Sequence, residues 1–243
     1  MRTRPSILIF SSVLALILGV QLLRGEVAAD QQKPASCIPS KKDPNRHEQF
    51  LKDKAAQLEK GPIQVVFEGD SITDGWRGGG KKVWKEYYSK YNTLNLGIGG
   101  DRTEHVLWRV QHGELDGLDP KVVVMMIGTN NIGSSVSDIV AGITCDVKAI
   151  HEKLPNTKIL LLGVFPRSPK PTDNARPKIK EVNEAISKLD GTDNVKYLDF
   201  GDKFLDPDGT LPKSIMPDAL HPNEKGYYIW AKAMQPTLDE LMK

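Results

Sequence analysis

A histidine and an aspartate stand three positions apart near the end of the chain, in the stretch Asp218-Ala-Leu-His221-Pro222. At this spacing the carboxylate can orient the imidazole, which is the arrangement that a general base needs. Pro222 suits the first position of a following helix, which would place His221 at the start of that helix. The helix dipole there disfavours imidazolium and Asp218 favours it, so together they would hold the base near neutrality.

A nucleophile for such a base is available in Ser71, within the stretch Gly69-Asp-Ser-Ile-Thr73 that directly follows an apolar run. Glycine allows a sharp turn, which would expose the Ser71 hydroxyl at the edge of a sheet. The same residues have a second interpretation, because Ser71-x-x-Asp74 also matches a capping box at the start of a helix. This motif alone leaves both interpretations open.

Two further loops carry groups that could stabilise an oxyanion. The stretch 95–101 has three glycines in four positions, which exposes backbone N–H groups near a helix start. It is no dinucleotide fingerprint, because Arg102 stands where that motif needs glycine. The stretch 128–131 contains Asn130, whose side chain can donate a hydrogen bond without carrying charge. Either loop alone is also compatible with ordinary turn chemistry.

The hydrophobic pattern predicts the scaffold that positions these loops. Short apolar runs typical of buried strands alternate with segments whose apolar residues recur at helical spacing. We expect strands at 63–67, 93–96, 121–127, 159–164 and 195–198, and helices at 50–58, 83–88, 106–110, 136–154, 179–189 and 227–241. Such alternation predicts an α/β fold with a parallel sheet covered on both faces, and ligands beyond the carboxyl ends of its strands. A serine, oxyanion donors and an Asp–His pair at that edge of the sheet are stronger evidence for a catalytic site together than any one of them is alone.

Length and composition limit the classes that remain. The chain has 243 residues, 39% of them hydrophobic, which suits one globular domain. Its 33 basic and 31 acidic side chains give a net charge of +2, which argues against nucleic acid as a partner. Two cysteines, Cys37 and Cys145, are too few for a zinc cluster or a disulfide framework. An oxidising compartment would permit a bond between them, but the sequence does not show that they meet. We expect no metal and no cofactor.

The N-terminus has the parts of a secretory signal peptide. Arg2 and Arg4 precede an apolar run over 7–23, which small residues ending at Ala29 follow. We expect cleavage after Ala29, a secreted or periplasmic mature protein, and no integral membrane span after cleavage. An uncleaved anchor is the alternative, because the run is near the lower length limit for a spanning helix. A polar segment over 30–44 would then precede a domain over 45–243.

The sequence resembles the SGNH (GDSL) hydrolase superfamily, whose four blocks it carries in order and at the usual separations: Gly69-Asp-Ser71, Gly100, Asn130 and Asp218-x-x-His221. The stretches 95–109 and 128–131 closely resemble the catalytic α subunits of intracellular platelet-activating-factor acetylhydrolase and their bacterial relatives. The resemblance implies a flavodoxin-like three-layer α/β/α sandwich with about five parallel strands.

The resemblance also implies a carboxylic ester hydrolase that works through an acyl-enzyme. In that reaction Ser71 is the nucleophile, His221 the base and Asp218 the acid that orients the base. The backbone N–H groups of Ser71 and Gly100, with the side chain of Asn130, form the oxyanion hole.

The residues beside this constellation bear on the substrate. Ile72, Thr129 and Leu220 each adjoin one of its members and look like the acetylhydrolase pocket positions, so we expect a narrow pocket and short, acetyl-type acyl chains. The export signal departs from the cytosolic acetylhydrolase subunits and puts a phospholipid substrate in doubt. An acetylated sugar or a lysophospholipid-like ester is the expected small-molecule partner. The sequence leaves the oligomeric state open, a homodimer included.

Other functions remain to be weighed. An acyltransferase would use the same acyl-enzyme with an alcohol in place of water, and a catalytically idle binding module could retain the same fold. The stretch Gly75–Lys81 nearly matches a phosphate-binding P-loop, but Lys82 replaces the Ser or Thr that would bind Mg²⁺. The absence of Gly-x-Ser-x-Gly argues against the ordinary α/β-hydrolase fold.

Overall fold

A five-stranded parallel sheet forms the centre of residues 33–243, the part of the chain that the computed structural model describes. The expected signal peptide over 1–29 lies outside these residues. The strands are β1 (Val65–Gly69), β2 (Thr93–Asn95), β3 (Val122–Met126), β4 (Lys158–Leu162) and β5 (Val195–Leu198). They lie in the order β2-β1-β3-β4-β5, and every neighbouring pair is parallel. This is the flavodoxin-like order, so the expected fold class is confirmed.

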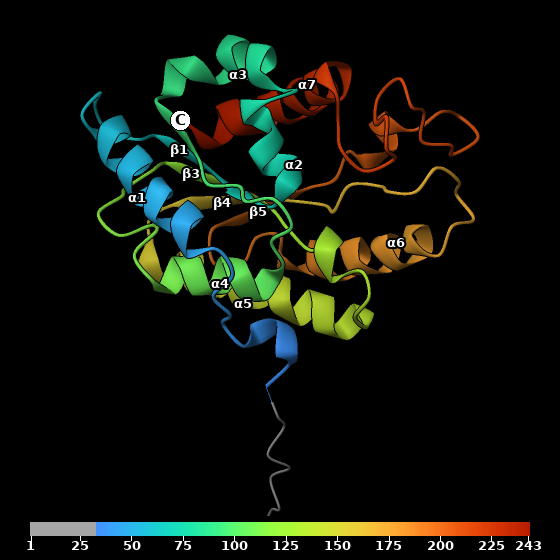
Figure 1. Cartoon of the computed structure of the whole chain (residues 1–243), viewed down its shortest axis with the longest axis horizontal. Helices are drawn as coiled ribbons and strands as arrows, with labels where there is room; N and C mark the ends of the chain where they lie inside the picture. Colours follow the sequence, from blue (N-terminus) through green and yellow to red (C-terminus); the bar gives the residue numbers. More distant parts are fainter. Residues whose placement is uncertain (1–32) are drawn as a thin grey trace, which may run out of the picture. The chain divides into compact units, whose positions relative to one another are not determined.

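Helices cover both faces of the sheet and complete the three layers (Figure 1). One face carries α1 (Pro44–Leu58), α4 (Thr103–Gln111), α5 (Val136–Lys153) and α6 (Ala175–Ile186). The other carries α2 (Ser71–Asp74), α3 (Lys81–Tyr88) and α7 (Glu224–Leu241). Short 3₁₀ helices connect these elements: η1 (Ala35–Cys37), η2 (Gly75–Arg77), η3 (Ser89–Tyr91), η4 (Thr129–Asn131), η5 (Ser187–Leu189) and η6 (Gly201–Phe204).

The central strand β3 explains why its sequence is continuously apolar. Because successive side chains point to opposite faces, Val123 and Met125 enter the core beneath α4 and α5, while Val124 and Met126 enter the core beneath α3 and α7. All five residues of β3 are buried. Each fully buried side chain of this kind contributes roughly 1.5–3 kcal/mol to folding.

The start of α7 differs from the expectation that Pro222 opens this helix. Asn223 is the N-cap, because its side-chain oxygen accepts a hydrogen bond from the Gly226 N–H at 3.2 Å, and the helix begins at Glu224. Asparagine at this position satisfies an N–H that proline, with no side-chain acceptor, would leave free. The prediction for Pro222 is therefore wrong, and His221 lies ahead of the cap.

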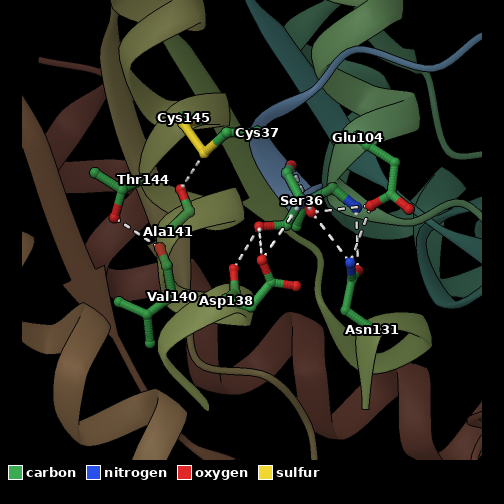
Figure 2. Close-up of a disulfide and its surroundings, with 10 residues drawn as sticks. Ser36, Cys37, Glu104, Asn131, Asp138, Val140, Ala141, Thr144 and Cys145 are labelled. Carbon is green, nitrogen blue, oxygen red and sulfur yellow. Dashed lines mark hydrogen bonds between the residues drawn. A yellow bond between two sulfur atoms is a disulfide. The ribbon is translucent and has the colours of Figure 1, made fainter. Parts of the chain in front are cut away.

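Residues 33–44 belong to the same compact unit as the rest of the described chain. Cys37 and Cys145 form a disulfide that joins η1 to α5, with their Cα atoms 5.8 Å apart (Figure 2). The structure thereby brings together two cysteines that the sequence could not pair. None of the helices within 33–243 is long and apolar enough to cross a membrane.

Candidate active site

The three loops predicted to carry the chemistry leave the carboxyl ends of adjacent strands. Ser71 follows β1 as the first residue of α2, Gly100 lies in the loop after β2, and Asn130 lies in η4 after β3. β1 and β3 are the strands between which the chain order reverses, which is where doubly wound sheets bind ligands. The loop after β2 lies against α2, since a Cβ at Gly97 would come within 2.3 Å of the Asp74 nitrogen.

Ser71, His221 and Asp218 form one connected chain of hydrogen bonds. Ser71 Oγ lies 2.9 Å from His221 Nε2, and His221 Nδ1 lies 2.6 Å from Asp218 Oδ2. The other oxygen of Asp218 accepts hydrogen bonds from the backbone N–H groups of Leu220 and His221. Partial burial opposes the effect, but the hydrogen bonds from His221 hold the pKa of Asp218 below its ordinary value. An ionised Asp218 can fix the imidazole with its Nε2 facing the hydroxyl.

The Ser71 hydroxyl is available because another residue caps the helix. Asp70 Oδ1 accepts a hydrogen bond from the Ile72 N–H at 2.9 Å, so Asp70 is the N-cap of α2. The capping-box interpretation of Ser71 is therefore wrong. Gly69 places the turn close to β3, since a Cβ there would come within 2.4 Å of the Met126 carbonyl oxygen.

His221 is hydrogen-bonded to Asp218 and lies outside helix α7. It precedes the N-cap Asn223 by two residues, and the effect of a helix dipole falls off within the first turn. The expected influence of the α7 dipole on His221 is therefore not supported by the observed helix start.

Each expected oxyanion donor has an N–H that is not used in a hydrogen bond within the described part of the chain. Within residues 33–243, no protein acceptor takes the backbone N–H of Ser71 or of Gly100. Gly100 has a φ of +73°, a conformation that favours glycine. Asn130 Nδ2 donates one hydrogen bond to the Asp101 carbonyl oxygen at 2.8 Å, and an amide nitrogen has a second hydrogen to give.

Two of the three expected pocket residues are enclosed by the fold. Ile72 is 1% exposed and packs in the core beneath α7, and Thr129 is 0% exposed. Arg167 donates to the backbone and side-chain oxygens of Thr129 at 2.9 and 3.3 Å. Leu220 is half-buried beside His221. The side chains of Ile72 and Thr129 are thus part of the packed interior, and these residues adjoin Ser71 and Asn130 in the chain.

Comparison with known proteins adds a second line of observation. Residues 67–229 match the model of the GDSL-like lipase/acylhydrolase family, and this range contains all the site residues above. The chain belongs to this family. It is a carboxylic ester hydrolase.

A curated relative agrees with this family membership, and solved structures share the fold of this GDSL-like hydrolase. It is 36% identical over 197 residues to platelet-activating factor acetylhydrolase IB subunit alpha1 from Homo sapiens, covering 81% of this chain and 82% of that protein. Among solved structures, an acetyl xylan esterase superposes with a TM-score of 0.62 at 22% identity, over 72% of this chain and 100% of that one. A catalytic mutant of an acetylxylan esterase from Geobacillus stearothermophilus gives 0.57 at 19%, over 74% and 94%.

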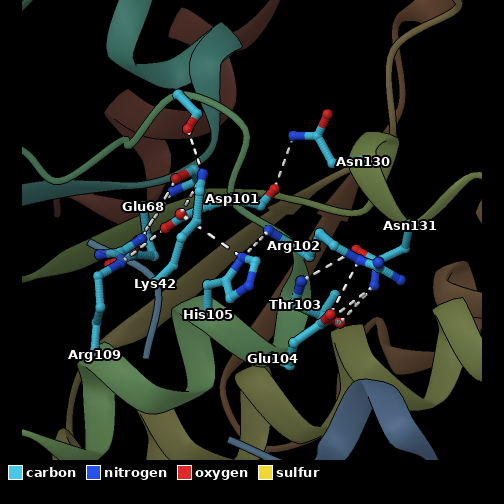
Figure 3. A network of polar contacts seen from close by, with 12 residues as sticks. Lys42, Glu68, Asp101, Arg102, Thr103, Glu104, His105, Arg109, Asn130 and Asn131 are labelled. Carbon is cyan, nitrogen blue, oxygen red and sulfur yellow. Dashed lines mark hydrogen bonds and ion pairs between the residues drawn. The ribbon is translucent and has the colours of Figure 1, made fainter. Parts of the chain in front are cut away.

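A buried ionic cluster includes Asp101, which directly follows Gly100 in the chain (Figure 3). Arg109 of α4 pairs with Glu68 at 2.7 Å and with Asp101 at 3.0 Å, and it also contacts Glu114. Burial lowers the pKa of Arg109, but the three carboxylates outweigh it and raise the pKa above the ordinary value. Within residues 33–243, no group of three or more His, Cys, Asp or Glu side chains is arranged to hold a metal ion.

Sequence reasoning on this GDSL-like hydrolase missed that cluster and also Lys42. Glu68 ends an apolar run, which is a signal, because a carboxylate in a buried strand needs a partner. No comparable signal marks Lys42. It stands in the polar segment before α1, and only the folded structure brings its side chain to the carbonyl oxygen of Gly99, 57 positions away.

Proposed function

We propose that this hydrolase is an exported serine esterase that cleaves short-chain, acetyl-type esters through an acyl-enzyme on Ser71. The observation that carries the proposal is the hydrogen-bonded series from Ser71 Oγ through His221 to Asp218. A serine hydroxyl is a weak nucleophile unless a neighbouring base accepts its proton, and this series supplies that base.

The reaction follows from the geometry. His221 Nε2 accepts the Ser71 proton as Oγ attacks the ester carbonyl, and the carbonyl oxygen becomes an oxyanion. The N–H groups of Ser71 and Gly100 and the second N–H of Asn130 stabilise that charge. His221 then donates its proton to the departing alcohol oxygen as the C–O bond breaks. Water, deprotonated by the same base, attacks the acyl-enzyme. As the bond from the acyl carbon to Ser71 Oγ breaks, His221 returns the proton to Oγ and the carboxylic acid is released.

A small acyl group suits the residues beside the proposed nucleophile. Ile72 and Thr129, the neighbours of Ser71 and Asn130 in the chain, are buried in the interior, so neither side chain is free to rearrange and make room for a long acyl chain. The similar proteins described above are named as an acetylhydrolase and as acetylxylan esterases, all of which release acetyl groups by name. Acetylated sugars are the leading substrate class, with lysophospholipid-like esters as the second.

Two features of the chain support export of this hydrolase from the cytoplasm. The pattern over residues 1–29 is that of a signal peptide. The Cys37–Cys145 disulfide supports it, because such bonds persist in oxidising compartments and are rare where glutathione keeps thiols reduced.

The test is a substrate series on purified mature protein. We expect a higher kcat/KM for p-nitrophenyl acetate than for the octanoate, and release of acetate from acetylated xylo-oligosaccharides. Ser71→Ala should abolish both activities while the protein remains folded. A higher kcat/KM for octanoate would refute the narrow pocket, and undiminished activity in Ser71→Ala would refute the mechanism.

A further inference from the structure

The segment 36–42, here called the strap, runs from the disulfide to the loop that carries Gly100. Its last residue, Lys42, has a side chain that is 33% exposed and extends over that loop. Lys42 Nζ donates to the Gly99 carbonyl oxygen at 2.6 Å and lies 3.3 Å from Asp101 Oδ1 (Figure 3). A Cβ at Gly100 would come within 3.0 Å of the same nitrogen.

The carbonyl that Lys42 binds belongs to the peptide group that holds the Gly100 N–H. Because a peptide group is planar and trans, its C=O and N–H point in opposite directions, and fixing one fixes the other. A peptide between two glycines has little steric resistance to rotation, so the sequence alone does not set its orientation. The ammonium selects the orientation in which the Gly99 oxygen faces the strap and the Gly100 N–H faces away from it.

The ammonium also strengthens that N–H as a donor. A charged group bound to a carbonyl oxygen draws electron density from the whole peptide group, and hydrogen bonds in such a series reinforce one another. The effect is greatest when negative charge develops at the acceptor, which happens in the tetrahedral intermediate and not in the bound ester.

The strap is held at both ends. Before Lys42, Cys37 is bonded to Cys145, and the Ser36 hydroxyl donates to the Asp138 carbonyl oxygen at 2.5 Å (Figure 2). After Lys42, Asp43 caps α1 by accepting a hydrogen bond from the Arg46 N–H.

The start and the middle of the strap are also tied to α4. The Ser40 N–H donates to the Glu104 carbonyl oxygen at 2.9 Å, and Thr103 Oγ1 donates to the Ser36 carbonyl oxygen at 3.2 Å. The strap therefore follows one path, and that path places Lys42 over the Gly99 oxygen.

We propose that Lys42 is a positioning residue, which aims and polarises the Gly100 N–H for the oxyanion, and that the Cys37–Cys145 disulfide holds the strap that carries it. This inference rests on the proposed function, since it concerns the oxyanion hole of that reaction. Asp101 does not depend on Lys42 for its charge balance, because Arg109 already pairs with its other oxygen.

The experiment compares Lys42→Met with a matched control at the neighbouring lysine. Lys41 lies over the Trp108 ring, 5.2 Å from its centre, and makes no hydrogen bond or ion pair to the loop that carries Gly100, so Lys41→Met should leave kcat unchanged. We expect Lys42→Met to lower kcat for p-nitrophenyl acetate roughly tenfold to a hundredfold, less than the full loss of one donor. KM should change less than threefold, and Lys42→Arg should restore part of kcat.

The disulfide arm uses the paired variant Cys37→Ala, Cys145→Ala. It should lower kcat per folded molecule, and adding Lys42→Met to it should cost less than Lys42→Met costs alone, because both changes release the same contact. Full additivity would overturn the role of the disulfide.

Three outcomes separate this inference from the proposed function. An unchanged kcat in Lys42→Met, or a raised KM with unchanged kcat, overturns the inference while an inactive Ser71→Ala leaves the esterase intact. Should Lys42→Met fail to fold, Lys42→Gln keeps an N–H donor without the charge and must still lose kcat. Activity that persists in Ser71→Ala overturns the proposed function itself.

Discussion

Asp70→Asn should make the free energy of unfolding depend less on pH, and the size of this effect follows from the burial of Asp70. The side chain of Asp70, which precedes Ser71, is 0% exposed, and burial raises the pKa of Asp70 from 3.8 to about 7. One pKa step corresponds to 1.36 kcal/mol, so the gap between these values corresponds to a cost on the order of 4 kcal/mol for keeping the ionised form folded.

The sign follows from which state holds the proton. Between about pH 4 and pH 7 folded Asp70 is protonated and unfolded Asp70 is not, so the folded state binds more protons. The free energy of unfolding contributed by this group therefore falls as pH rises through that window. Asparagine cannot ionise and is an equally good N-cap for the Ile72 N–H. Asp70→Asn should thus gain stability relative to wild type by about 4 kcal/mol between pH 4 and pH 8.

Urea unfolding of both proteins at pH 4, 6 and 8 measures this difference. Burial also raises the pKa values of Glu68 and Asp146, but these residues are present in both proteins and their contributions subtract out. Asp43→Asn, at the partly exposed N-cap of α1, is the control and should show no comparable trend. A constant difference between wild type and Asp70→Asn at all three pH values would refute the reasoning.

Three further predictions concern the site and its supports. Asn130→Ala should lower kcat roughly a hundredfold to a thousandfold, with KM little changed, because it removes one oxyanion donor; a near-normal kcat per folded molecule would exclude Asn130 from the site. The kcat/KM for acetate esters should rise from acidic to neutral pH, because only a neutral imidazole can accept the Ser71 proton, and EDTA should have no effect. Removing the disulfide by Cys37→Ala with Cys145→Ala should cost roughly 2–5 kcal/mol in urea unfolding without reductant, since the bond joins residues 108 positions apart.

The sequence predicted those parts of the fold whose signal is local. β3 is continuously apolar and α5 keeps three-four spacing, so the structure places both within two residues of expectation. The motif residues Ser71, Asp218 and His221 could be selected because each stands in a short pattern with a chemical meaning.

The sequence did not predict which of two neighbouring residues caps a helix, nor contacts between residues far apart in the chain. Asp70 takes the cap of α2 that Ser71 could have taken, although aspartate and serine are about equally good caps. Asn223 takes the cap of α7, which leaves Pro222 ahead of that helix. Lys42 meets Gly99 across 57 positions, and no local pattern encodes that contact.

Covalent labelling tests the central claim, that Ser71 is the nucleophile of this hydrolase. Wild-type protein is treated with a fluorophosphonate, digested, and the modified serine is identified by mass spectrometry, with Ser71→Ala treated in parallel. We expect a single adduct on Ser71, loss of esterase activity in step with labelling, and no adduct on Ser71→Ala. An adduct on another serine, with Ser71→Ala still active, would contradict it.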